Sequence, residues 1–179
     1  MDWIFRERGE EKHRDPLGAE FFNNEELLSD ASSLVREAIQ NSLDAKAHPD
    51  CSFKAGPPGF VKVIEPNVLA FPDYDGNGMF KSLGNVVVNA HVGLLFITMH
   101  GKLQRLRVNG TASIDFSDPL LGSFEGAQLV VRVRAEHIFP NCPRYIHRMA
   151  LEEISVYAPA AGHEPPTPAW KEMEAFRDY

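Results

Sequence analysis

The segment from Leu129 to Glu136 has apolar residues at every odd position and charged residues at positions 132, 134 and 136, and the remaining even position is Val130. Successive side chains of a β-strand point to opposite faces, so this pattern predicts a strand with one buried face and one wet face. The side chains expected to face inward are Leu129, Val131, Val133 and Ala135, and those expected to face outward are Arg132, Arg134 and Glu136.

Short apolar segments between turn signals recur through the middle of the chain. Strands are predicted at Cys51–Lys54, Phe60–Glu65, Val68–Phe71, Val92–Met99 and Leu103–Ile114. Gly, Pro, Asn and Asp separate these segments, and short strands at such spacing favour an antiparallel barrel or sandwich. The chain is therefore expected to be mainly β over residues 48–157.

The two ends of the chain have a different character. Residues 1–47 are predicted to form a charged arm and one amphipathic helix from Asn24 to about Leu43, with an apolar stripe at three- and four-residue spacing. Residues 158–169 are rich in Pro and Ala and are typical of a linker. Trp170–Tyr179 is predicted to be a short amphipathic helix or an arm, which makes 158–179 a C-terminal segment.

Composition excludes several classes of protein. A formal net charge of −7 disfavours general binding to nucleic acid, which needs a basic surface. No apolar run is long enough to span a bilayer, so no membrane partner is expected. The two cysteines, Cys51 and Cys142, provide no disulfide framework and indicate a reducing compartment, so a cytoplasmic location is expected.

Within the stretch Phe71–Phe96, three glycines and several polar side chains lie between two apolar runs. Glycines let backbone N–H groups approach a ligand closely, and Lys81 and Ser82 add a charge and a hydroxyl donor. A strand–segment–strand unit that grips a phosphate is one interpretation. A solvated hairpin connection is the other, since such connections also collect Gly, Asn and Asp.

Within the N-terminal helix, the sequence SLVREAIQNSLDA places Glu37 and Asn41 four residues apart on one face. This motif resembles the first nucleotide-binding motif of the GHKL ATPases, in which the two equivalents position the attacking water and hold magnesium. The second, Asp- and Gly-containing motif of that family does not fit at Asp75–Gly78. An amphipathic docking helix is the favoured interpretation of this segment.

Four sequence blocks in order resemble the pyridoxamine 5′-phosphate oxidase-like FMN-binding split-barrel family. They are GPPGFVKV, LAFPDYDGNGMFKSLGNVVVNAHVGLLF, LRVNGTASI and VRVRAEHIFPNCPRYIHRM. The resemblance covers residues 48–179 and implies a six-stranded split β-barrel, a homodimer, and FMN in clefts at the dimer interface. It departs at the front, where EAIQNSL is polar in place of the family's first apolar strand.

The resemblance and the chemistry of the side chains together give a set of candidate cofactor residues. Family members contact the phosphate and ribityl chain through basic and hydroxyl groups, and the ring through backbone groups. For the charged candidates, exposed positions on a wet sheet face are the alternative interpretation. The candidates are Lys54, Phe60, Val61, Lys62, Asn77, Gly78, Met79, Lys81, Ser82, Asn85, Arg105, Arg107, Cys142, Arg144 and Tyr145.

Three side chains that can bind metals, His137, Cys142 and His147, lie near one another in the sequence. A spacing of five residues places the cysteine on the opposite side of a strand from either histidine, and no zinc-like pairing of ligands accompanies them. No metal is therefore expected. No neighbouring base that would make Cys142 a nucleophile is visible in the sequence either.

The predicted function is that of an FMN-binding flavoprotein, acting as a flavin-dependent oxidoreductase on a small-molecule substrate or electron donor that the sequence leaves open. The cofactor would carry the electrons, and the protein would set its position and polarity. Two alternatives are a flavin-binding module without enzymatic activity and a fragment of a GHKL-type ATP-binding protein.

Overall fold

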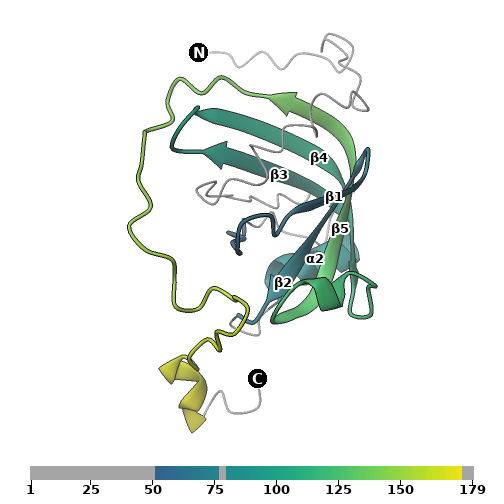
Figure 1. Ribbon diagram of the computed structural model, residues 1–179. Helices are drawn as coiled ribbons and strands as arrows, with labels where there is room; N and C mark the ends of the chain where they lie inside the picture. Colours follow the sequence, from purple (N-terminus) through teal and green to yellow (C-terminus); the bar gives the residue numbers. More distant parts are fainter. Residues whose placement is uncertain (1–50, 77–79, 175–179) are drawn as a thin grey trace.

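The structure is a computed structural model of the chain, and it describes residues 51–76 and 80–174 (Figure 1). The helix predicted from Asn24, its GHKL-like motif, and the candidate cofactor residues Asn77, Gly78 and Met79 lie outside these ranges.

The described residues form one five-stranded antiparallel sheet, which confirms the mainly-β prediction. The order of strands across the sheet is β1-β2-β5-β4-β3. The resemblance implied six strands, and the described residues contain five. Figure 1 shows the sheet strongly bent, with β3 and β4 running steeply across the direction of β2. The strands are β1 (Lys62–Glu65), β2 (Val68–Tyr74), β3 (His91–Thr98), β4 (Gln104–Asp115) and β5 (Ala127–Pro140).

The alternating segment forms the middle of β5, at the centre of the sheet. Its predicted inward residues Leu129, Val131, Val133 and Ala135 are all buried in the main hydrophobic core. The intervening Val130 is also buried, in a smaller cluster on the other face with Ala70 and Phe124. β5 is therefore covered on both faces at this end, because the short 3-10 helix η1 (Leu121–Ser123) packs against it.

A β-bulge changes the alternation near the end of β5. Asn109 of β4 pairs with His137, whereas Gly110 pairs with Ala135, so Glu136 has no partner in the ladder. Before this extra residue the side chains in the main core belong to odd-numbered residues, and beyond it the even-numbered Ile138 lies in the core. The sequence pattern could not place this bulge, because the pattern ends at Glu136.

One α-helix lies where none was predicted. α2 (Lys81–Val88) lies in the segment between β2 and β3, so the two predicted flanking strands are present and the segment between them contains a helix. The alternative, a hairpin connection, is wrong, because β2 and β3 are not neighbours in the sheet. Leu83 and Val86 are three residues apart and face the main core, while Val87 and Val88 are exposed. Valine favours strands locally, so packing of this one apolar face decides the helix.

Two further predicted elements are corrected. Cys51–Lys54 is not a strand, because β1 already occupies the edge of β2 that this segment would need. For Trp170–Tyr179, predicted to be a short amphipathic helix or an arm, the described part ends at residue 174 and contains a single 3-10 turn, η2 (Ala169–Glu172), in place of an α-helix. Between β5 and η2 the chain forms no named helix or strand, and in Figure 1 it sweeps in a wide arc away from the sheet.

None of the helices in the described ranges is both long and apolar enough to cross a membrane.

Candidate functional site

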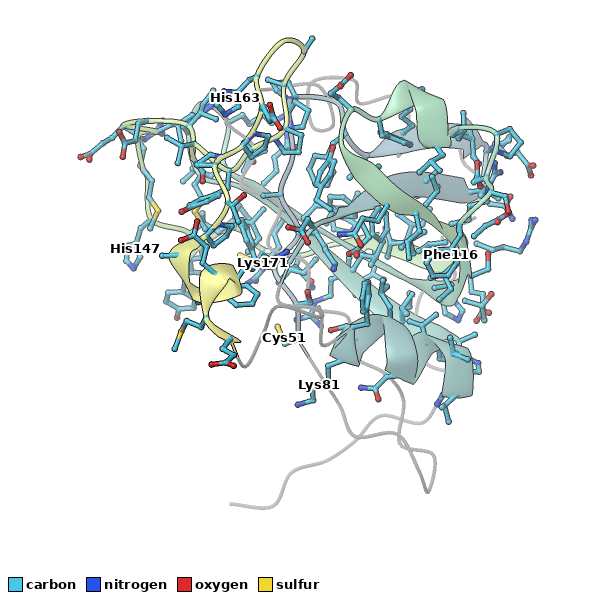
Figure 2. All side chains as sticks on the ribbon, turned by 90° about the horizontal axis from the view of Figure 1, so that it is seen from below. Cys51, Lys81, Phe116, His147, His163 and Lys171 are labelled. Carbon is cyan, nitrogen blue, oxygen red and sulfur yellow. The ribbon has the colours of Figure 1, made fainter. Side chains whose placement is uncertain are left out.

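A cavity of about 600 Å³ lies where the start of α2, the end of β2 and the segment before β1 meet, and we call it the polar cavity. Figure 2 labels Cys51, Lys81 and Lys171, which come from three distant parts of the chain and belong to its wall. The residues that line it are Cys51, Ser52, Phe53, Lys54, Ala55, Pro72, Asp73, Tyr74, Asp75, Gly76, Phe80, Lys81, Ser82, Leu83, Gln128 and Lys171.

The first turn of α2 forms one wall of the polar cavity. Lys81 is exposed, and Ser82 is buried with 7% of its surface accessible. The residue before the helix, Phe80, makes no side-chain cap, and the first turn contains no acidic residue. The N-terminal end of a helix carries partial positive charge and favours anions. This wall therefore combines a lysine, a hydroxyl and the positive end of a helix.

Two ion pairs join the other charged residues of the wall. Lys54 Nζ lies 2.8 Å from Asp73 Oδ1, and both side chains are largely buried. Lys171 Nζ lies 2.5 Å from Asp75 Oδ2, which ties η2 to the residue that follows β2. Three lysines and two aspartates line the cavity, which leaves a net charge of +1 on its wall.

A second, apolar cavity of about 470 Å³ adjoins the polar cavity, and we call it the apolar cavity. Phe53, Ala55 and Tyr74 belong to the walls of both. Its remaining wall comes from Gly56–Pro58, Phe60, the β3–β4 turn and the chain that follows β5. Burial raises the pKa of the Tyr74 phenol to about 12, so this phenol stays protonated and can donate a hydrogen bond at neutral pH.

The structure brings together three of the predicted cofactor residues and separates the others from them. Lys54, Lys81 and Ser82 line the polar cavity. Asn85 lies one turn further along α2 and does not line it. Phe60 and Val61 are part of the main core, and Phe60 also reaches the apolar cavity. Lys62 points to η1, where its Nζ donates to Ser123 Oγ at 2.8 Å and lies 4.3 Å from the centre of the Phe124 ring.

The remaining candidates gather at the far end of β5 from the polar cavity. Tyr74 pairs with Ala127, at the start of β5, whereas Leu106 pairs with Pro140, at its end. Just beyond that end, Arg105 Nη2 donates to the backbone oxygen of Cys142 at 2.8 Å. Arg105 Nε and Asn141 Oδ1 are buried there without hydrogen-bond partners. The candidates at this end, which we call the distal group, are Arg105, Arg107, Cys142, Arg144 and Tyr145.

Within the distal group, the Cys142 thiol is exposed. A hydrogen bond from the Arg144 backbone, a further one from its side chain, and the nearby arginine charges lower the pKa of this thiol. Arg107 is exposed, and Tyr145 retains 83% of its accessible surface. These groups face outward from a single chain.

Several residues of the polar cavity were not predicted. Asp73 and Tyr74 lie in the quoted PDYD stretch, but their roles in the wall depend on where Lys54 and the apolar cavity fall. No local signal connects Lys171 with Asp75, 96 residues earlier in the chain. Over the described ranges, no three His, Cys, Asp or Glu side chains gather in an arrangement that could hold a metal ion.

No protein-family model and no curated protein matches this chain. Among solved structures, HupZ of Group A Streptococcus is similar at 16% identity and a TM-score of 0.46, covering 72% of this chain and 98% of HupZ. A variant of HupZ gives 17% identity and a TM-score of 0.44, over 66% of this chain and 97% of that one. A provisionally assigned pyridoxamine 5′-phosphate oxidase of Lactobacillus delbrueckii gives 23% identity and a TM-score of 0.43, and the match covers 68% of this chain and 88% of that protein.

Proposed function

We propose that this protein binds FMN in the polar cavity, with the phosphate at the first turn of α2. The observation that carries the proposal is the convergence of Lys81, Ser82 and the N-terminal end of α2 on one cavity wall. A lysine charge, a hydroxyl and a helix N-terminus are groups that favour a phosphate. The sequence resemblance names FMN as the phosphate-bearing ligand.

The rest of the cavity system fits the remainder of FMN. The ligand joins an anionic phosphate, a polar ribityl chain and a planar ring system, and the polar cavity has walls suited to each: the first turn of α2, polar side chains, and the aromatic side chains Phe53, Tyr74 and Phe80. The polar cavity is lined by lysines and aspartates near α2, and Phe53 and Tyr74 lead from it into the apolar cavity. Sites of this kind combine apolar walls with a few placed polar groups.

With FMN bound, the protein would act as a flavin-dependent oxidoreductase, since the flavin itself supplies one- and two-electron chemistry. The alternative is a flavin-binding module that turns over no donor. Anaerobic stopped-flow absorbance, used to monitor whether NADH or NADPH reduces the bound FMN, separates the enzyme from the module. Catalytic reoxidation with an added acceptor supports the enzyme, and FMN that no donor reduces supports the module.

We also propose that the protein is a homodimer. The distal group contains basic and aromatic side chains that face outward from one chain, away from the polar cavity of that chain. A two-fold arrangement would allow the distal group of one chain to complete the site of its partner. Closed two-fold dimers are the commonest assemblies of soluble proteins.

FMN binding is tested with Lys81→Gln, measured by flavin fluorescence and by the visible absorption of the purified protein. We expect Lys81→Gln to weaken FMN binding about ten- to a hundredfold, because a charged hydrogen bond to phosphate is lost. Binding of riboflavin, which has no phosphate, should not change. The matched control is Lys102→Gln, because Lys102 is an exposed lysine of the β3–β4 turn and does not line the polar cavity. A colourless wild-type protein that binds no added FMN would overturn the proposal.

A further inference from the structure

Phe80 has a backbone conformation that phenylalanine rarely adopts. Its φ of 44° and ψ of 29° lie in the left-handed region, and it is the only non-glycine residue with positive φ in the described ranges. The Cβ atom of an L-residue is crowded in this region, and glycine or asparagine is the usual occupant. A large aromatic residue at this position is therefore strained.

The fold itself gains little from a phenylalanine at this position. Phe80 stands at the N-cap of α2, where Ser, Thr, Asp or Asn would cap the helix with a side-chain oxygen. Phe80 makes no such cap, and 45% of its surface is exposed, so it is not a core residue. Neither capping nor burial accounts for the strain, which suggests that the ring serves another purpose.

A second exposed phenylalanine faces the same space. Phe53 precedes the sheet, is 54% exposed, and lines the polar cavity together with Phe80. Tyr74, with its protonated phenol, completes an aromatic lining beside Lys54 and Lys81. Exposed aromatic faces at a ligand cavity bind planar rings by offset stacking or edge-to-face contact.

We propose that Phe53 and Phe80 form an aromatic clamp that holds the isoalloxazine ring of the flavin at the polar cavity. This inference rests on the proposed function and adds two side chains to it. The ring would lie against apolar faces supplied by two segments that the fold brings together. With this strained backbone, Phe80 lines the polar cavity and does not belong to the core.

The clamp is tested by measuring the dissociation constants of FMN and riboflavin for Phe80→Leu and Phe53→Leu. Each leucine keeps an apolar side chain but removes the aromatic face. We expect each variant to weaken the binding of both flavins by the same factor of about ten, because stacking involves the ring, which both flavins have, and not the phosphate. The matched control is Phe116→Leu. Phe116 is 65% exposed and lies away from Cys51 and Lys81 in Figure 2, and it lines neither cavity.

A glycine variant separates this role from a structural one. Phe80→Gly relieves the positive φ, so its melting temperature should be equal to or above that of the wild type, while flavin binding weakens. A fall in its melting temperature would show that Phe80 supports the fold and would overturn the clamp. The clamp would also be overturned if the dissociation constants of FMN and riboflavin stayed unchanged in both leucine variants. If Lys81→Gln still weakened FMN binding in that case, the proposed FMN site would stand without the clamp. A wild-type protein that binds neither flavin would overturn the clamp and the FMN site together.

Discussion

The carboxylate of Asp118 is buried beside β5, with 4% of the residue accessible. Arg132 Nε and Nη2 donate to its two oxygens at 2.5 and 2.9 Å, and the Leu120 N–H donates to Oδ1 at 2.8 Å. The hydrogen bond from Arg132 is the main cause that lowers the pKa of Asp118, and burial opposes it. The pair ties the turn before η1 to the outward face of the central strand.

Asp118→Asn should lower the free energy of unfolding at pH 7 by about 1.5–3 kcal/mol, the range for hydrogen bonds to charged groups. Because the pKa is lower in the folded protein, the stabilisation is complete above the unfolded value near 4 and is lost as the pH falls through the folded value. The difference between variant and wild type should therefore shrink towards pH 3.

Urea unfolding at pH 7 and at pH 3 measures this difference. Glu136→Gln is the control, since this exposed carboxylate at the β5 bulge is not a partner of Arg132. A difference that stays constant between the two pH values would contradict the assignment.

The bulge between β4 and β5 shows how one residue sets the register of two elements. A Cβ atom on Gly110 would overlap the backbone oxygen of Arg134 and crowd the Cα of Ala135. The two strands therefore approach more closely than any other residue type at position 110 would allow. This close approach accompanies the shift that brings Ile138 into the core.

Gly110→Ala should destabilise the protein by about 2–4 kcal/mol, because the strands must separate or the bulge must move. The same substitution at Gly84 should have the opposite effect on stability. Gly84 is an exposed residue inside α2, and an added Cβ would meet nothing within 4 Å apart from its own helical turn. Alanine should therefore raise the free energy of unfolding by about 0.5–1 kcal/mol. Guanidinium unfolding of both variants is the measurement. Equal stability of Gly110→Ala and the wild type would show that the strands are not held together at this point.

At the scale of the whole molecule, the chain that follows β5 exposes an unusual amount of apolar surface. Met149, whose backbone N–H donates to the Met99 oxygen at 2.7 Å, is one of the few points where this segment is attached to the sheet. The exposed apolar side chains of the segment are Tyr145, Met149, Leu151, Ile154, Val156 and Tyr157, between 44% and 83% accessible. Burial of such a surface is the usual driving force of association.

We expect light scattering after gel filtration to give the mass of a dimer. The double variant Ile154→Ser/Tyr157→Ser should weaken dimerisation at least about tenfold, because each large apolar side chain contributes about 1.5–3 kcal/mol when it is buried. Phe116→Ser is the control, because it removes an equally exposed ring elsewhere. A wild-type protein of monomeric mass at every concentration would contradict the homodimer while leaving FMN binding to its own test.

The sequence alone determined most of the strands, and the period of two along Leu129–Ala135 predicted which side chains of β5 lie in the main core, because alternate side chains of a strand share a face. It also pointed to Lys54, Lys81 and Ser82 through resemblance and side-chain chemistry. Tertiary structure decided the rest. Val-rich α2 is a helix because Leu83 and Val86 pack on the core, against local preference. Lys171 meets Asp75, and Phe53 meets the cavity of Phe80, only because the fold brings distant segments together. Contacts at such separation leave no local pattern, whereas the alternation of a strand is written residue by residue.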